Sequence, residues 1–79
     1  MQKHTQIFTN YFSIGQDDRP LCEVCQSRQI VDVHHIYGRG KGMNIIENLV
    51  GLCRSCHNDA HNNKISKDQL TEIHLKNLL

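Results

Sequence analysis

The sequence has few of the residues that usually build a large hydrophobic core. The 79-residue chain contains no Trp, and its only aromatic residues are two Tyr and two Phe. A domain of this size buries too little apolar surface to be comfortably stable alone. Such chains often rely on a disulfide, a bound metal or a partner subunit. We therefore expect a single domain over residues 1–79 that is held together by an added crosslink.

Segments that direct a protein into or across a membrane are also missing. No run approaches the roughly 20 apolar residues that a membrane-spanning helix requires. Residues 1–15 lack the apolar stretch and small-residue cleavage site of a secretory signal. We therefore expect a soluble, intracellular, cytoplasmic protein, in which thiols stay reduced.

A large charge of either sign is absent, since the formal net charge is +1. The slight positive excess lies in residues 28–64, where five Lys and Arg residues stand against three Asp and Glu residues. Alone, this excess does not identify a nucleic-acid-binding protein.

Cysteine, by contrast, is well represented, in two pairs with the spacing Cys-x-x-Cys. The pairs are Cys22/Cys25 and Cys53/Cys56. Each pair can present two sulfurs from one tight turn, and two such knuckles complete a tetrahedral zinc site. A redox pair would be expected near a βαβ pattern, which the sequence lacks. We predict a structural Zn²⁺ bound by the four cysteines.

Two helices are predicted outside the cysteine pairs. Apolar residues on one face favour an amphipathic helix over residues 5–13, with Thr5 as its N-cap and Gly15 as its stop. A capping box of Ser66 and Gln69 predicts a second helix over residues 67–78. The second helix is expected to bury Leu70, Ile73, His74 and Leu78, whereas His4 is interpreted as a surface residue.

The region between the cysteine pairs favours two strands and a loop. "QIVDVHHI", residues 29–36, is rich in β-branched residues and is typical of a strand. Residues 37–44 contain three glycines and indicate a loop, and "NLVGLC", residues 48–53, is a candidate partner strand. The second cysteine pair should lead directly into a helix starting near Ser55.

Four histidines flank this loop. His34 and His35 are neighbours on the predicted strand, so their side chains should point to opposite faces. His57 and His61 are four residues apart, so on a helix they share one face. The cysteine site ties that helix to the strand region and would allow a strand histidine to face it.

These residues together resemble the HNH endonuclease family. The matching segments are "DVHHI" at residues 32–36, "ENL" at 47–49 and "LCRSCHNDAH" at 52–61, while "CEVC" resembles the zinc-bearing branch. The resemblance implies a small α+β fold. Its ββα-metal core, also called a His-Me finger, would span about residues 21–63 between the flanking helices.

The resemblance also implies a role for each matched residue. His34 and His57 would bind a catalytic divalent ion, and His61 would be a further metal ligand or a phosphate contact. His35 would be the general base, and Asn48 would orient it. Many family members have Asp where His34 stands. A histidine site suits Zn²⁺, Ni²⁺ or Mn²⁺ better than Mg²⁺.

The implied activity is metal-dependent hydrolysis of DNA, by nicking or by double-strand cleavage. Imidazole can accept a proton near neutral pH, so activity should fall below about pH 6. Small stand-alone HNH proteins are common in phages and prophages, and some work beside a packaging terminase, a possible partner here. RNA or branched DNA is an alternative substrate. A catalytically silent zinc module that binds nucleic acid or protein is the alternative function.

Further contacts to DNA are predicted around the loop. Arg39, Lys41 and Arg54 could hold phosphates, and Tyr37 could stack or wedge against the duplex. The alternative for each is a solvated surface residue.

Overall fold

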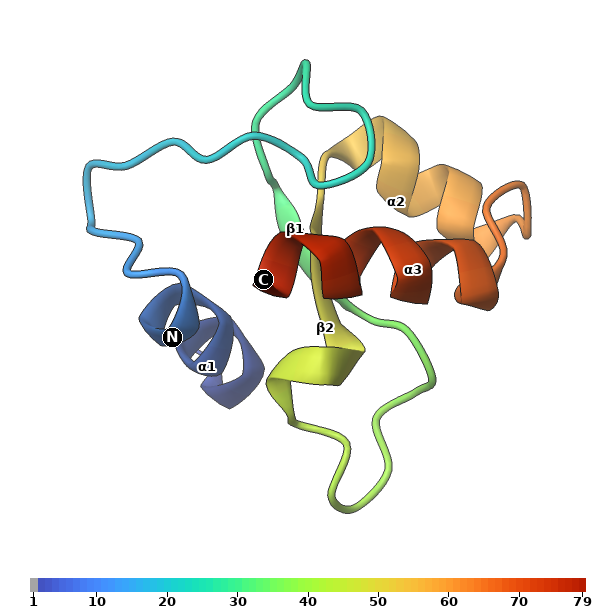
Figure 1. Cartoon of the computed structure of the whole chain (residues 1–79), viewed down its shortest axis with the longest axis horizontal. Helices are drawn as coiled ribbons and strands as arrows, with labels where there is room; N and C mark the ends of the chain where they lie inside the picture. The colour runs from blue at the N-terminus through green and yellow to red at the C-terminus, as the bar shows by residue number, and fades with distance from the viewer. Residues whose placement is uncertain (1) are drawn as a thin grey trace.

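The computed structural model describes residues 2–79 (Figure 1). Its elements, in chain order, are α1 (Lys3–Tyr11), β1 (Asp32–His35), the short 3₁₀ turn η1 (Ile46–Asn48), β2 (Leu49–Leu52), α2 (Arg54–His61) and α3 (Lys67–Leu78). In Figure 1, α3 crosses in front of the two strands and α1 lies beside η1. The small α+β fold predicted from the sequence is confirmed.

The two strands form an antiparallel sheet at the centre of the fold. The register pairs Asp32 with Leu52 and His35 with Leu49. β1 is shorter than the predicted strand over residues 29–36. The first part of the predicted strand instead closes the cysteine knuckle, through an isolated bridge between Leu21 and Gln29. The partner strand covers residues 49–52, within the predicted 48–53.

Every residue of β2 is buried because helices cover both faces of the strand. On one face, a Cβ added at Gly51 would lie 2.7 Å from Cζ of Phe8 and 2.5 Å from Cδ1 of Ile30. The missing side chain therefore lets α1 pack directly on the strand. Neighbouring residues in a strand face opposite sides, so Val50 and Leu52 point away from α1.

Helix α1 begins and ends earlier than the sequence predicted. It starts at Lys3 after Gln2, whose side chain makes no capping hydrogen bond, so Thr5 is not the N-cap. The helix ends at Tyr11, and Ser13 adopts a φ of 55°. The Ile14 amide donates to the Thr9 carbonyl. This pattern is a Schellman ending with serine at the left-handed position, which replaces the expected stop at Gly15.

The predicted bounds of α3 are confirmed, and Leu70 and His74 are buried as predicted, whereas Ile73 and Leu78 are only half-buried. α2 starts at Arg54, one residue before the predicted Ser55. In α3 the Gln69 amide donates to Oγ of Ser66, and the Ser66 amide donates to Oε1 of Gln69. Leu70 is 1% exposed and packs against the core, with Ile65 beside it. Burying one such leucine stabilises a fold by about 2 kcal/mol.

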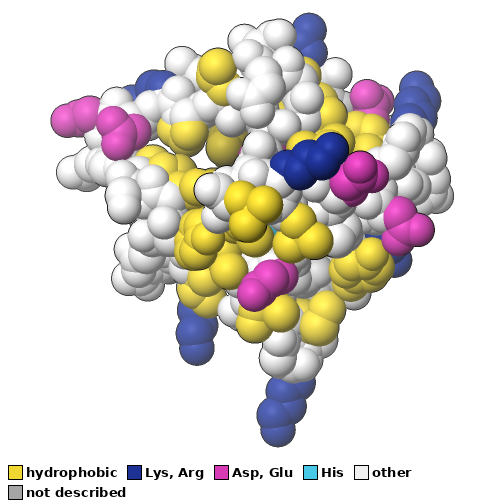
Figure 2. Space-filling model, in the orientation of Figure 1, with side chains coloured by type: hydrophobic (Ala, Val, Ile, Leu, Met, Phe, Trp, Pro, Cys, Tyr) yellow, Lys and Arg dark blue, Asp and Glu magenta, His cyan; other side chains and the backbone are white. Residues whose placement is uncertain are grey.

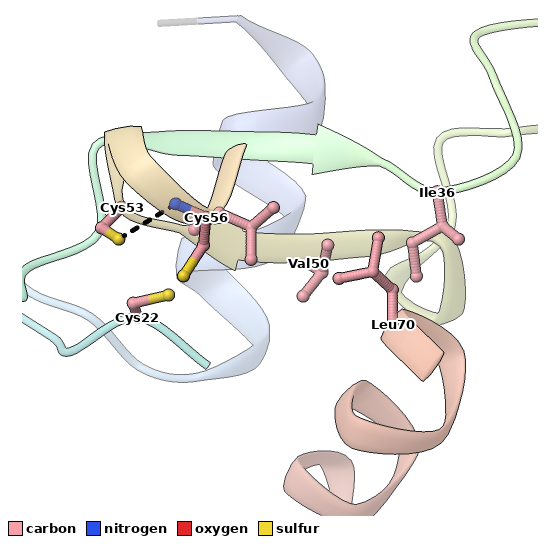
Figure 3. Packing of buried hydrophobic residues seen from close by; sticks show 7 residues of the cluster. Cys22, Ile36, Val50, Cys53, Cys56 and Leu70 are labelled. Carbon is pink, nitrogen blue, oxygen red and sulfur yellow. Dashed lines mark hydrogen bonds between the residues drawn. The ribbon is translucent and has the colours of Figure 1, made fainter. Parts of the chain in front are cut away.

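The four cysteines lie together next to this core. Their sulfur atoms are all within 4.8 Å of one another. Cys22 and Cys25 come from the first knuckle, Cys53 is the N-cap of α2, and Cys56 lies in the first turn of that helix. Figure 3 shows three of these thiols facing one another beside Val50 and Leu70, with the Cys56 amide donating to Sγ of Cys53. Four clustered sulfurs without a disulfide fit a zinc ion.

Ionisation of the thiols supports the same interpretation. Hydrogen bonds from the Ser27 and Arg28 amides lower the pKa of Cys25 to about 6. The Cys56 amide likewise lowers the pKa of Cys53, whereas burial raises the pKa of Cys56. Two of the thiols therefore ionise more easily than an ordinary cysteine, and a bound cation would offset the cost of ionising Cys56.

A buried polar network attaches α3 to the first knuckle. Nδ1 of His74 lies 2.7 Å from a carboxylate oxygen of Glu23, and Nε2 of His74 lies 2.6 Å from the Ile46 carbonyl oxygen. The other Glu23 oxygen accepts from the Gly51 amide at 2.7 Å. His74 is 0% exposed and Glu23 is 7% exposed. The predicted burial of His74 is confirmed, and its partner comes from the cysteine knuckle.

Figure 2 shows the face of the molecule that carries α3. Hydrophobic side chains gather there, while Lys and Arg side chains stand apart from one another. Within residues 2–79, no helix has both the length and the apolar character needed to cross a bilayer.

Replacing Cys53 with Ser should remove zinc and unfold the domain, because the zinc site joins the knuckle to β2 and α2. Native mass spectrometry should find one zinc ion in the wild type and none in Cys53→Ser. Ser55→Ala, which changes an exposed residue of α2, is the control and should also hold one zinc ion. Circular dichroism should show loss of cooperative folding in Cys53→Ser alone. A cooperatively folded, zinc-free Cys53→Ser protein would contradict this prediction.

Replacing His74 with Leu should destabilise the zinc-loaded protein by about 3 kcal/mol near pH 6, since it leaves the Glu23 carboxylate buried without its main partner. Burial lowers the pKa of His74, but the hydrogen bonds to Glu23 and to the Ile46 carbonyl outweigh it, so the net direction is upward. Protonated His74 therefore contributes its full share of folding stability below the unfolded pKa of about 6.5. This contribution is lost as the pH rises through the pKa of His74 in the folded protein.

Urea unfolding of wild type and His74→Leu at several pH values between about 6 and 9 tests this dependence. The stability difference should be largest at the low end and shrink as the pH rises. Glu72→Gln is the control, because it breaks only the exposed 3.4 Å pair with Lys76 and should change stability by less than about 0.5 kcal/mol. A difference that does not vary with pH would count against a charged His74.

Candidate metal centre and catalytic site

Three histidines form a second cluster. His34 comes from β1, and His57 and His61 come from one face of α2. One ring nitrogen from each lies within 4.8 Å of the others. The two Nε2 atoms on α2 are 3.0 Å apart. Since zinc binds imidazole nitrogen at about 2.0–2.1 Å, two ligands of one ion lie slightly more than 3 Å apart. The cluster therefore fits one metal ion.

The surroundings of His34 keep its imidazole neutral. Burial, and then the nearby His57 and His61, lower the pKa of His34 to about 4. A neutral imidazole has the free lone pair that metal ligation needs. His34 is thus ready to bind a cation at neutral pH.

Asp32 contacts one histidine of this cluster. Its Oδ2 lies 2.9 Å from Nδ1 of His57. A carboxylate accepts, so His57 carries its proton on Nδ1 and its Nε2 is free to face the other histidines. Asp32 is part of the matched segment "DVHHI", but it was given no role in the sequence analysis. Its position two residues before His34, on the same face of a strand, was the available signal.

His35 has different neighbours from His34, as expected for adjacent residues of a strand. Its ring centroid lies 4.6 Å from that of His4, and its Nε2 lies 2.8 Å from Oδ1 of Asn44. Its Nδ1 is buried and has no hydrogen-bond partner among residues 2–79. The doublet thus separates into His34, which belongs to the three-histidine cluster, and His35, which is held apart from it.

The interpretation of His4 as a surface residue was wrong. His4 is 9% exposed, because the face of α1 that carries Phe8 also turns His4 toward β1. The sequence pattern emphasised apolar residues, so a histidine on the inward face escaped notice.

Asn48 holds the loop after β1 and makes no side-chain hydrogen bond to His35. Its Oδ1 accepts from the Tyr37 amide at 2.8 Å. Its Nδ2 donates to the carbonyl oxygens of Gly38 at 3.2 Å and Met43 at 3.0 Å. Asn48 was expected to orient His35 through its side chain or its backbone carbonyl. The side chain instead clamps the loop, and the carbonyl accepts from the Ile36 amide at 2.9 Å. Asn44, which sequence reasoning did not select, makes the contact with His35.

One cleft of about 750 Å³ connects these groups. Its walls come from α1, β1, the following loop and α2. Among its lining residues are His4, His34, His35, His57, His61 and Arg39. Asp32 is the only acidic side chain in the lining among residues 2–79. The cleft therefore suits an anionic substrate such as a phosphodiester.

Of the three basic residues predicted to hold phosphates, only Arg39 lines this cleft. Nη1 of Arg54 lies 3.4 Å from Oδ2 of Asp32. Lys41 is exposed in the loop. The Tyr37 hydroxyl lies 3.4 Å from a carboxylate oxygen of Asp68 and accepts from Thr71 at 3.2 Å. Tyr37 is thereby attached to α3, although half of its surface stays exposed.

Comparison with known proteins agrees with this geometry. The family model described as HNH endonuclease matches residues 22–63. This segment is more than half of the chain and contains both cysteine pairs, the histidine doublet and α2. Searches of curated proteins and of solved structures found no match. The chain belongs to the HNH endonuclease family.

Proposed function

We propose that the protein is a metal-dependent endonuclease that hydrolyses DNA phosphodiester bonds. One observation carries this proposal. A three-imidazole cluster and a fourth imidazole, held separately, line the same cleft. A zinc module that only binds nucleic acid or protein would need neither group, because the cysteine cluster alone stabilises the fold.

His34, His57 and His61 would hold the catalytic ion. When bound, a divalent ion neutralises charge on the phosphate and assists departure of the leaving oxygen as a Lewis acid. The all-imidazole donor set favours Zn²⁺ or Ni²⁺ over Mg²⁺. Asp32 would keep His57 in the tautomer that directs Nε2 into the cluster.

His35 would act as the general base. Its neutral imidazole would take a proton from a water as the water oxygen bonds to phosphorus. The bond between phosphorus and the 3′ oxygen would break, and that oxygen would gain a proton from solvent. The products would be 5′-phosphate and 3′-hydroxyl ends. Arg39 would draw the substrate phosphate into the cleft.

The family also bears on the substrate and on a partner. Membership of the family supports a nucleic-acid substrate. We also propose that the intrinsic sequence preference is weak. A phage terminase or another specificity partner remains a prediction from family resemblance.

A plasmid-nicking assay tests the activity. Zinc-loaded wild type should convert supercoiled plasmid to nicked or linear DNA with Ni²⁺, Mn²⁺, Mg²⁺ or added Zn²⁺, and EDTA should stop it. His35→Ala should reduce the rate at least 100-fold, because general-base catalysis is worth about 10²–10⁴-fold. Intact plasmid with every metal, or equal nicking by His35→Ala, would favour the silent zinc module. Parallel reactions with RNA and a branched junction would rank the substrates.

Metal binding should separate the two members of the histidine doublet. Titration of Ni²⁺ into zinc-loaded protein, followed by calorimetry, should give at least tenfold weaker binding for His34→Ala than for wild type. His35→Ala is the matched control and should bind within about threefold of wild type, since His35 lies outside the cluster. Equal losses in both variants would argue against separate roles.

A further inference from the structure

Asn44 contacts His35 from a loop in which the sequence motifs assigned no catalytic residue. Its Oδ1 is 2.8 Å from Nε2 of His35. An amide oxygen has no proton and can only accept a hydrogen bond. The proton of neutral His35 must then lie on Nε2, which leaves the lone pair on Nδ1.

The surroundings of Nδ1 leave its lone pair unused. Nδ1 of His35 is buried and has no hydrogen-bond partner among residues 2–79. Buried polar atoms without a partner are rare in native proteins and often mark a functional position. No described protein group uses this lone pair, so Nδ1 can accept a proton from a reactant once a neighbouring group moves to admit it.

The position of Asn44 depends on the clamp made by Asn48. Nδ2 of Asn48 binds the carbonyl of Met43, the residue directly before Asn44, and also the carbonyl of Gly38. Gly38 has a φ of 103°, a conformation that suits glycine. Asn48 thus closes both ends of the loop and thereby carries Asn44 to His35.

We propose that Asn44 is a positioning residue for His35, fixing the proton on Nε2 so that Nδ1 is the basic atom. This inference rests on the proposed function of His35 as general base. It also gives Asn48 an indirect role, because Asn48 would act on His35 through the loop and Asn44.

Nitrogen-15 NMR of His35 tests the tautomer without any catalysis. In zinc-loaded wild type without other metals at about pH 8, Nε2 should give a protonated-type shift and Nδ1 an unprotonated-type shift. Asn44→Ala should move the two shifts toward each other as the tautomers mix, whereas Asn44→Asp keeps an acceptor and should preserve the wild-type pattern. Asn10→Ala, an exposed asparagine of α1, is the control and should match wild type. Identical His35 shifts in wild type and Asn44→Ala would overturn the assignment.

Steady-state kinetics then test the effect on catalysis. Asn44→Ala should lower kcat about tenfold while KM changes less than threefold, and Asn44→Asp should recover most of kcat. Since Asn44 is exposed in the loop, Asn44→Ala should keep the circular dichroism and unfolding midpoint of wild type. An unchanged or increased kcat for Asn44→Ala would overturn the proposal. Failure of the wild type to cleave any substrate would instead overturn the proposed function and leave the NMR result to decide the tautomer.

A double-mutant cycle tests the route from Asn48. If Asn48 acts through Asn44, the losses in kcat from Asn44→Ala and Asn48→Ala should be far from multiplicative. The Asn48 variant should also disturb the His35 nitrogen shifts in the same direction as Asn44→Ala. Independent, multiplicative losses with unaltered shifts in Asn48→Ala would exclude this route.

Discussion

The meeting of four thiols at the start of α2 is the constraint on which the rest of the structure depends. Cys53 directly follows β2 and is the N-cap of α2, and Cys56 lies one turn later. A metal bound there fixes the direction in which α2 leaves the sheet. That direction places His57 and His61 opposite His34. In a chain with so small a core, one ion bound there would set both the fold and the geometry of the second cluster.

The two clusters differ in chemistry because their donors and surroundings differ. The cysteine cluster is closed, lies against buried aliphatic side chains, and offers four sulfurs suited to a permanent ion. The histidine cluster offers three nitrogens at the edge of an open cleft, so an ion there would keep room for a substrate. The same helix carries ligands of both clusters, on its first turn and on its later turns. One rigid element thus links the two clusters.

Much of this arrangement could be predicted from local signals. The cysteine spacing, the capping box of α3 and the four-residue spacing of His57 and His61 each specify a geometry by themselves. The missed features depend on tertiary packing. α1 lacks a side-chain cap, so its start could not be located from the sequence. The inward turn of His4 depends on Gly51 allowing α1 to approach. The contact from Asn44 depends on how Asn48 closes a glycine-rich loop, which no periodicity reveals.

The buried carboxylate of Glu23 connects the metal site to the far end of the chain. Glu23 follows Cys22 directly and binds His74 on α3. Docking of α3 and binding of a metal by the first knuckle would therefore favour the same conformation of one segment. Two processes that share a conformation are thermodynamically coupled, and the coupling is reciprocal. The metal affinity of the cysteine site would thus be partly a property of the C-terminal helix.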